Sequence, residues 1–106
     1  MAETVTAPPK TRRKTETREA VERPRLHKVI LHNDDFTPRE FVVLVLNAVF
    51  GMGRDTAHGI MLTAHLRGAC VVAVFTREIA ETKASEATDL GRRAGHPLTF
   101  TTEPEE

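Results

Sequence analysis

The sequence has too few cysteines and too little net charge for several common classes of protein. Of its 106 residues only Cys70 is a cysteine, which excludes a disulfide framework, and no CxxC or CxxH spacing suggests zinc. The 15 basic and 15 acidic side chains balance, so no overall field draws the chain toward nucleic acid or anionic lipid. No segment approaches the roughly 20 apolar residues that span a bilayer, and no signal-peptide core is present. We therefore expect a soluble cytoplasmic protein.

The first 25 residues have almost no large apolar side chains. They are mostly Thr, Pro, Glu, Arg and Lys, and such a composition offers nothing to offset the entropy of ordering the chain. We predict a flexible N-terminal extension over residues 1–25, a folded domain over 26–103 and a frayed end over 104–106. The basic cluster KTRRK keeps a nucleic-acid-binding module open as an alternative, although interleaved glutamates dilute its charge and no aromatic residue is there to stack on bases.

Three short segments have the composition of β-strands. LHKVILH, residues 26–32, alternates loosely around two apolar positions and ends at Asn33, Asp34 and Asp35, which are residue types that favour turns. ACVVAVF, residues 69–75, is continuously apolar and predicts a well-covered strand. LTFTT, residues 98–102, alternates and predicts a half-exposed strand.

A helix is predicted directly after the acidic turn. Thr37 is a suitable N-cap, Pro38 suits the first helical position, and Glu40 would complete a capping box. Phe36 and Phe41 are spaced as a hydrophobic staple. Apolar side chains then repeat at helical intervals as far as Phe50, at Phe41, Leu44, Val45, Ala48 and Val49.

Two further helices follow. The first covers residues 54–66 and ends at Gly68, with one face formed by Ala57, Ile60, Met61, Ala64 and His65. The second begins after a Thr76 cap and ends at Gly95, with a narrow stripe formed by Ile79, Ala80, Ala84, Ala87, Leu90 and Ala94. The predicted order is β-α-α-β-α-β. It corresponds to an α+β fold in which helices pack on a three-stranded sheet.

The polar residues do not form a familiar catalytic pattern. Asp34 and Asp35 are consecutive and point to opposite sides of an extended chain, so they are poorly placed as a facing acid–base pair. His58 and His65 lie two helical turns apart, about 10 Å, which is too far for one metal ion. No HExxH, GxSxG or phosphate-binding glycine pattern is present. We predict that the chain is not an enzyme and has no cofactor, and keep a metal-dependent hydrolase using Asp34, Asp35 and His65 as an alternative.

Three polar side chains suggest a binding site instead. Taken singly, Asn33 and Asp35 are ordinary turn residues, and His65 is an ordinary core histidine. Together, a carboxylate, an amide oxygen and a neutral imidazole nitrogen supply three acceptors for one small cation. With Val42, Met61 and Ala64 as apolar walls behind them, the site would suit an ammonium group that carries a hydrophobic side chain.

At this point the sequence resembles a known family. The segments KVILHNDDFTPREFVVLVLNAVF, GIMLTAHLRGACVVAVFTREIAETKA and HPLTF are similar, in the same order, to those of the ClpS family of ATP-dependent Clp protease adaptors. The resemblance covers about three quarters of the chain. It implies a βααβαβ fold and an adaptor function. Such an adaptor binds N-degrons, which here are N-terminal Leu, Phe, Tyr or Trp residues, and delivers the proteins that carry them to the ClpAP protease.

The resemblance also assigns roles by position. Asn33, Asp35 and His65 would hold the substrate α-amino group, with Asp34 as a supporting residue. The side chain of the first substrate residue would enter a hydrophobic pocket formed by Leu31, Thr37, Val42, Met61, Ala64 and Leu98. Glu78 and Lys83 would contact the N-terminal domain of a ClpA-type AAA+ unfoldase, and no membrane or nucleic-acid partner is expected.

Two positions differ from the family's pattern. Arg39 stands at the pocket entrance, where the best-known members have an apolar Met. We expect its stem to lie along the entrance and to reshape access for the largest side chains. Ala64 is smaller than the valine expected there and would widen the wall. The ranking among Leu, Phe, Tyr and Trp is therefore left open by the sequence.

Overall fold

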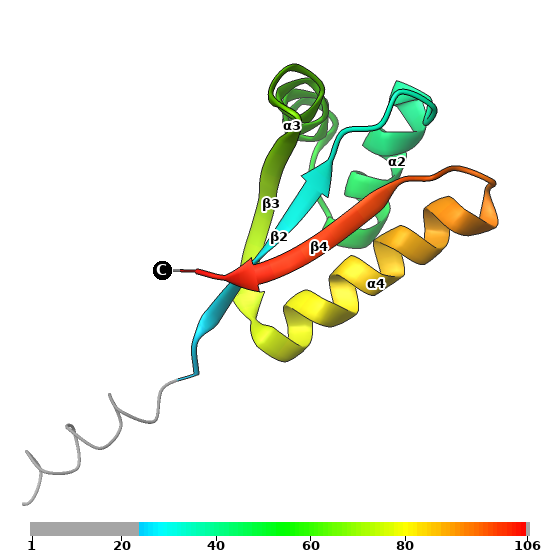
Figure 1. The fold of residues 1–106 in the computed structure, drawn as a ribbon. Coiled ribbons are helices and arrows are strands. Elements are labelled where there is room, and N and C mark those ends of the chain that lie inside the picture. The colour runs from blue at the N-terminus through cyan, green and yellow to red at the C-terminus, as the bar shows by residue number, and fades with distance from the viewer. Residues whose placement is uncertain (1–23, 106) are drawn as a thin grey trace, which may run out of the picture.

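A computed structural model describes residues 24–105, which form a sheet with helices packed on it (Figure 1). The elements in chain order are β2 (Leu26–His32), α2 (Arg39–Phe50), α3 (Arg54–Arg67), β3 (Ala69–Thr76), α4 (Arg77–Arg93) and β4 (Thr99–Pro104). This confirms the predicted α+β fold and its βααβαβ order. The extension predicted over 1–25 falls almost entirely outside the described residues.

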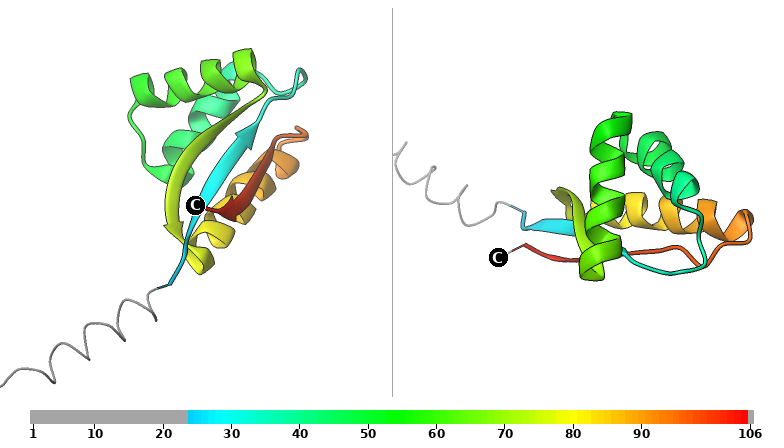
Figure 2. Two further views of the ribbon diagram at one scale, coloured as in Figure 1. Left: turned by 60° about the vertical axis from the view of Figure 1, so that its left-hand side comes forward. Right: turned by 90° about the horizontal axis from the view of Figure 1, so that it is seen from above.

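The sheet has the strand order β3-β2-β4, and both pairings are antiparallel. Seen from above, α4 and α2 lie on one side of the strands (Figure 2). The core forms between these layers, where Val29 and Leu31 of β2 meet the buried side of the helices. Within the described residues, no helix has both the length and the apolarity needed to cross a membrane.

The prediction that residues 69–75 form a well-covered strand was wrong about coverage. β3 is an edge strand, and Val71 and Val74 on it are 45% and 37% exposed. A continuous apolar run indicates a strand, but which faces become covered depends on the helices that later pack there. Here Val72 is buried in the core, while Val71 and Val74 remain in contact with solvent.

The start of α2 also differs from the prediction. Pro38, not Thr37, is the N-cap residue, and no side-chain hydrogen bond caps the helix. The Thr37 hydroxyl is engaged elsewhere, because it donates to the Asp34 carboxylate at 2.8 Å. Phe36 is 80% exposed, so the predicted staple between Phe36 and Phe41 does not form.

The remaining boundaries are close to those predicted. α2 ends at Phe50, as the break at GMG predicted, and its C-cap Gly51 has a φ of 71°, which glycine adopts easily. α4 begins after Thr76, although the Thr76 side chain makes no capping bond. Ile79 was placed in the buried stripe of α4 but is exposed.

The C-terminal strand is longer than predicted. β4 continues to Pro104, which pairs with His27. The next amide, Glu105 N–H, donates to the Leu26 carbonyl at 2.8 Å. Residues 104 and 105 are thus held at the sheet, contrary to the prediction of a frayed end.

Candidate functional site

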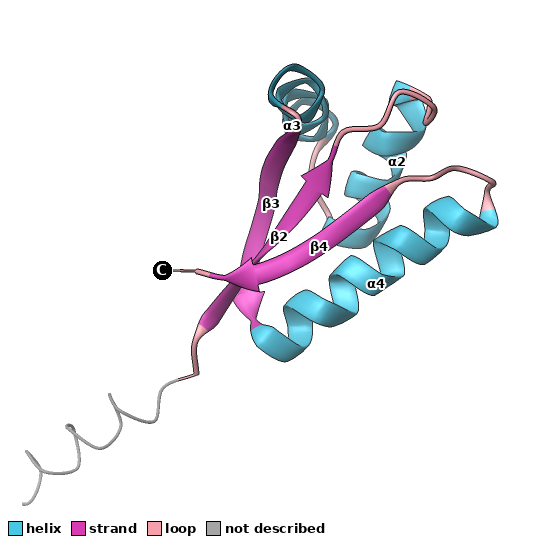
Figure 3. Cartoon of the chain, in the orientation of Figure 1, coloured by secondary structure: helices cyan, strands magenta, loops and turns pink. Residues whose placement is uncertain are grey.

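The β2–α2 loop and the loop before β4 lie at the same end of the molecule (Figure 3). The first of these loops is also fastened to α3. The backbone N–H of Asn33 donates to the carbonyl of Gly68, just after α3, at 3.0 Å. This bond brings the Asn33–Asp35 segment beside the C-terminal turn of α3, which carries His65.

A cavity of about 290 Å³ opens between these segments. Its lining includes every residue that the sequence analysis placed at the amino-group site or in the hydrophobic pocket, as well as His32 and Pro38: Leu31, His32, Asn33, Asp34, Asp35, Thr37, Pro38, Arg39, Val42, Met61, Ala64, His65 and Leu98. The proximity of these residues is therefore observed, while their roles remain predictions. Glu78 and Lys83, predicted for a different surface, do not line this cavity.

The cavity has two parts of different character. We call its buried apolar side chains the pocket floor, formed by Leu31, Val42, Met61, Ala64 and Leu98. We call its exposed polar side chains the rim, formed by Asn33, Asp35, Arg39 and His65. Floor residues come from β2, α2, α3 and the segment before β4, so the cavity forms only where these four segments pack together.

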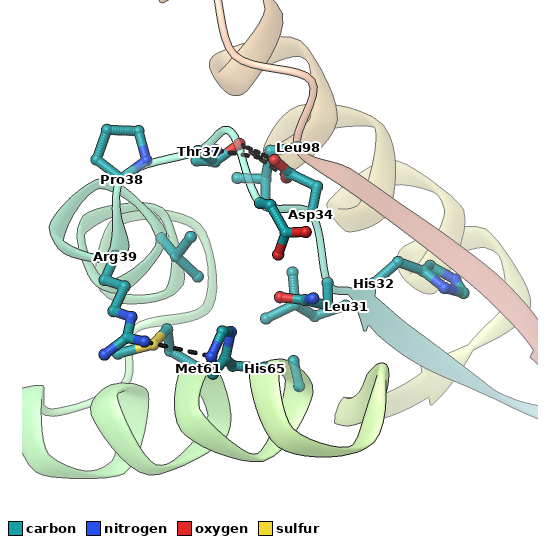
Figure 4. Close-up of a pocket in the computed structure, with 13 residues that line it drawn as sticks. Leu31, His32, Asp34, Thr37, Pro38, Arg39, Met61, His65 and Leu98 are labelled. Carbon is teal, nitrogen blue, oxygen red and sulfur yellow. Dashed lines mark hydrogen bonds between the residues drawn. The ribbon is translucent and has the colours of Figure 1, made fainter.

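The two neighbouring aspartates have different surroundings. One carboxylate oxygen of Asp34 accepts the amide hydrogens of Phe36 and Thr37, each at 2.8 Å, and also bonds the Thr37 hydroxyl (Figure 4). Asp34 is thus a structural residue that shapes the turn. Asp35 lines the cavity and is exposed, and within residues 24–105 its carboxylate has no hydrogen-bond donor. The charge of Asp35 is available to a ligand.

His65 lies at the rim and is not a core histidine. It is exposed, while its neighbours Met61 and Ala64 are buried in the floor. Arg39 reaches across the entrance to it, with 3.3 Å between Arg39 Nη2 and His65 Nε2 (Figure 4). A guanidinium only donates hydrogen bonds, so Nε2 is the acceptor and the imidazole proton is on Nδ1. Arg39 is exposed and lines the cavity, and its predicted effect on access stays a prediction.

The two lining residues that the sequence analysis missed have no evident polar role in the cavity. The His32 imidazole points away from it and bonds Thr101 Oγ1 at 2.7 Å across the sheet (Figure 4). Pro38 is exposed and is the N-cap residue that precedes α2. Each directly adjoins predicted site residues in the chain, and that adjacency was the available signal.

Glu78 and Lys83 lie on α4, away from the cavity. Glu78 is exposed in the first turn of the helix. Lys83 is half-buried, and its Nζ donates to the carbonyl of Val49 near the end of α2 at 2.9 Å. Lys83 therefore connects α4 to α2 in addition to any role in binding a partner.

Two features of the described residues bear on catalysis: the grouping of metal-ligating side chains and the thiol of Cys70. Within residues 24–105, no three His, Cys, Asp or Glu side chains come close enough to hold a metal ion, so the hydrolase alternative lacks its metal site. Burial raises the pKa of the Cys70 thiol, and the opposing effect of Arg67 is smaller. Such a thiol is less reactive than an ordinary one, because the thiolate is the nucleophile. The basic cluster KTRRK of the nucleic-acid alternative lies outside the described residues.

An apolar floor under a polar rim is the arrangement of a small binding domain. Residues 22–101 match the family described as ATP-dependent Clp protease adaptor protein ClpS. The chain therefore belongs to the ClpS family, as the sequence resemblance predicted. This is a family of non-catalytic adaptors, in agreement with the prediction that the chain is not an enzyme.

Individual relatives support this assignment. ATP-dependent Clp protease adapter protein ClpS 1 of Bradyrhizobium diazoefficiens is 66% identical over 96 residues, which cover 91% of this chain and 95% of that protein. ClpS 2 of Mesorhizobium japonicum is 62% identical over 102 residues, covering 96% and 97%. The solved structure of Agrobacterium tumefaciens ClpS2 bound to L-phenylalaninamide has a TM-score of 0.78 and 65% identity, covering 78% of this chain and all of the other.

Proposed function

We propose that this chain binds the free α-amino group and the bulky first side chain of proteins that begin with Leu, Phe, Tyr or Trp, and delivers these proteins to the ClpAP protease. The observation that carries the proposal is the joining of the apolar floor and the polar rim in one cavity of about 290 Å³. That size is near the lower end of ligand cavities, roughly 300 Å³, and suits one side chain. The solved relative's ligand, L-phenylalaninamide, has a free amino group and such a side chain.

The rim supplies acceptors for the ammonium group. In the proposed complex, Asp35, the Asn33 amide oxygen and the His65 imidazole accept its three hydrogens. Asp35 is the strongest of these acceptors, because its charge is not used within the described protein. Asp34 acts indirectly by fixing the turn that carries Asp35.

The floor and the rim together distinguish a free hydrophobic N-terminus from other peptide segments, and neither does so alone. Burial of a Leu or Phe side chain contributes about 1.5 to 3 kcal/mol, and each hydrogen bond to a charged group about 1.5 to 3 kcal/mol before ordering costs. An internal Phe contributes the burial of its side chain but has no ammonium group to form the hydrogen bonds. An acetylated N-terminus loses the charge and leaves acceptors unpaired, at about 1 to 3 kcal/mol for each one that is desolvated.

Delivery requires a second surface. We place the contact with the N-terminal domain of a ClpA-type unfoldase on α4, at Glu78 and Lys83, remote from the cavity lining. Glu78 is the cleaner position to test, since Lys83 also bonds the Val49 carbonyl. The N-terminal extension, residues 1–25, is proposed as the segment that the unfoldase engages. The proposal keeps the cytoplasmic location expected from the sequence.

The test compares two fluorescent peptides that begin with Phe and differ only in N-terminal acetylation. Fluorescence anisotropy should show binding of the free peptide and a loss of at least tenfold in affinity for the acetylated one. Equal affinities would refute the proposal. A third peptide with Ser in place of the initial Phe separates the contribution of the floor from that of the rim.

A further inference from the structure

We infer that Arg39 makes this site prefer substrates with an acidic residue at their second position. The inference rests on the proposed function, because it assumes that the first substrate residue occupies the cavity. It concerns the next residue, for which neither the floor nor the amino-group acceptors provide a partner. The observation behind it is the 3.3 Å contact between Arg39 Nη2 and His65 Nε2.

This contact and the binding of an ammonium group by His65 exclude each other. A neutral imidazole has one nitrogen that donates and one that accepts. Arg39 takes the accepting nitrogen, Nε2, in the structure without ligand. If the ring keeps this tautomer, an ammonium group competes with Arg39 for Nε2. If the ring changes tautomer so that Nδ1 accepts the ammonium, Nε2 carries the proton and can no longer accept from Arg39. Binding of the substrate amino group to His65 therefore displaces the guanidinium of Arg39.

The displaced guanidinium has no acidic partner waiting in the protein. Among the described residues, the only ion pair within 4 Å is between Arg77 and Glu81, at the far end of α4. Glu40 is adjacent to Arg39 on α2 and lines the same hollow between α2 and α3, but it forms no ion pair with Arg39. The ligand itself is the available source of a carboxylate.

The surface offers the substrate a path past Arg39. A second hollow lies between α2 and α3 and shares two lining residues, Arg39 and Met61, with the cavity. Arg39 thus stands at the border between the two spaces. A chain whose first residue fills the cavity and which continues along the α2–α3 hollow brings its second side chain beside this guanidinium.

The charged side chains that line the α2–α3 hollow are Arg39, Arg54 and Glu40, so its lining is net positive and favours an acid at this place. Asp35 faces the substrate ammonium, and Asp34 is bound to the amides of its own turn. Arg39 is then the charged rim group that lacks a partner. With an apolar residue in its place, as with Arg39→Met, the two aspartates would instead repel an acidic second residue.

The experiment measures anisotropy with peptides that begin Phe-Glu, Phe-Gln or Phe-Lys and are otherwise identical. Since Arg39 is exposed, we expect the wild type to bind Phe-Glu about two- to fivefold more tightly than Phe-Gln, and Phe-Lys less tightly than either. In Arg39→Met the preference for Glu should vanish or reverse. Phe-Gln should bind this variant at least as tightly as it binds the wild type, because the competitor for His65 is gone.

Arg25→Met is the matched control. It removes the same charge from an exposed arginine at the opposite end of β2, about 20 Å or more from the cavity. This variant should keep the wild-type preference for Glu. The preference should also weaken as salt is raised, because the groups involved are exposed.

The outcomes separate this inference from the proposed function. Equal affinities of the wild type for Phe-Glu and Phe-Gln would overturn the inference, as would a preference for Glu that persists in Arg39→Met. Weaker binding of Phe-Gln by Arg39→Met would contradict the displacement of Arg39. Acetylated Phe-Gln serves in each case as the reference for the proposed function. If acetylation abolishes binding while Glu and Gln are equivalent, only the inference fails.

Discussion

The floor and the rim of the cavity lie within one site but relate differently to the rest of the molecule. The floor residues belong to the hydrophobic core, so the same side chains stabilise the fold and shape the cavity. The rim residues are exposed and contribute little to the core. A change in the floor should alter stability and binding together, whereas a change in the rim should alter binding alone.

The largest effect is expected in the floor. Leu98 is 1% exposed, and Leu98→Ala should lower the free energy of unfolding by about 3 kcal/mol, because it removes buried methyl groups and leaves a cavity. Urea denaturation followed by circular dichroism measures this loss, and peptide binding should weaken as well.

The matched control for Leu98 is Leu66→Ala. Leu66 is 79% exposed on α3, and its truncation should change stability by less than about 0.5 kcal/mol. Similar losses for the two variants would contradict the view that the cavity floor is part of the core.

The rim should show the opposite behaviour. Asp35→Asn keeps the size of the side chain but removes the charge that we propose for the substrate ammonium. Affinity for a Phe-initiated peptide should fall about 10- to 100-fold, while the free energy of unfolding stays within about 0.5 kcal/mol. Anisotropy and urea denaturation measure the two quantities.

The control for Asp35 is Asp89→Asn, which removes an equivalent charge from the exposed surface of α4. It should leave both affinity and stability near their wild-type values. A loss of stability in Asp35→Asn comparable to its loss of binding would end the distinction between floor and rim.

The floor was the easier part to predict from the sequence. The sequence analysis placed apolar walls at Val42, Met61 and Ala64, and all three are buried in the core. Met61 and Ala64 share one helical face, so local periodicity was enough to predict that these two side chains point inward. The order of helices and strands was predictable for the same reason. The positions of Leu31, Thr37, Arg39 and Leu98 in the cavity came from the family resemblance, because no local pattern joins such distant segments.

What could not be predicted depends on competition between neighbouring groups. Thr37 has the properties of an N-cap, but Asp34 lies three residues earlier and binds the Thr37 hydroxyl and amide itself. The exposure of β3 depends on its place at the edge of the sheet, which its own residues do not encode. Likewise, the Arg39–His65 contact joins the start of α2 to the end of α3.

Asp34 tests the comparison of floor and rim further, because it belongs to neither of them. Its carboxylate binds two amides and a hydroxyl in the turn that carries the rim. Asp34→Ala should lower the free energy of unfolding by about 1 to 2 kcal/mol and weaken peptide binding through misplacement of Asp35. Asp34→Asn retains an oxygen acceptor and should lose less in both respects. A full loss in Asp34→Asn would mean that the charge of Asp34, rather than the turn, matters.

The smallest effect is expected at Gly91 of α4, which contacts the floor residue Leu98 but does not line the cavity. A Cβ added at Gly91 would lie 3.0 Å from Leu98 Cβ, which is closer than ordinary van der Waals contact. Leu98 has little freedom to retreat, because it is fully buried and the preceding segment is fixed by a 2.9 Å bond from His96 N–H to the Gly91 carbonyl.

Alanine at Gly91 gains up to about 1 kcal/mol of helix propensity but incurs overpacking of about 1 to 3 kcal/mol. We therefore expect Gly91→Ala to be destabilised by about 1 kcal/mol and to bind peptide less tightly, since Leu98 must move. Gly59→Ala on α3 is the matched control, because its new Cβ would meet no atom within 4 Å. That variant should instead be stabilised, by up to about 1 kcal/mol. The two alanines thus have opposite predicted signs in urea denaturation, and a stabilised Gly91→Ala would mean that the floor yields more readily than its burial implies.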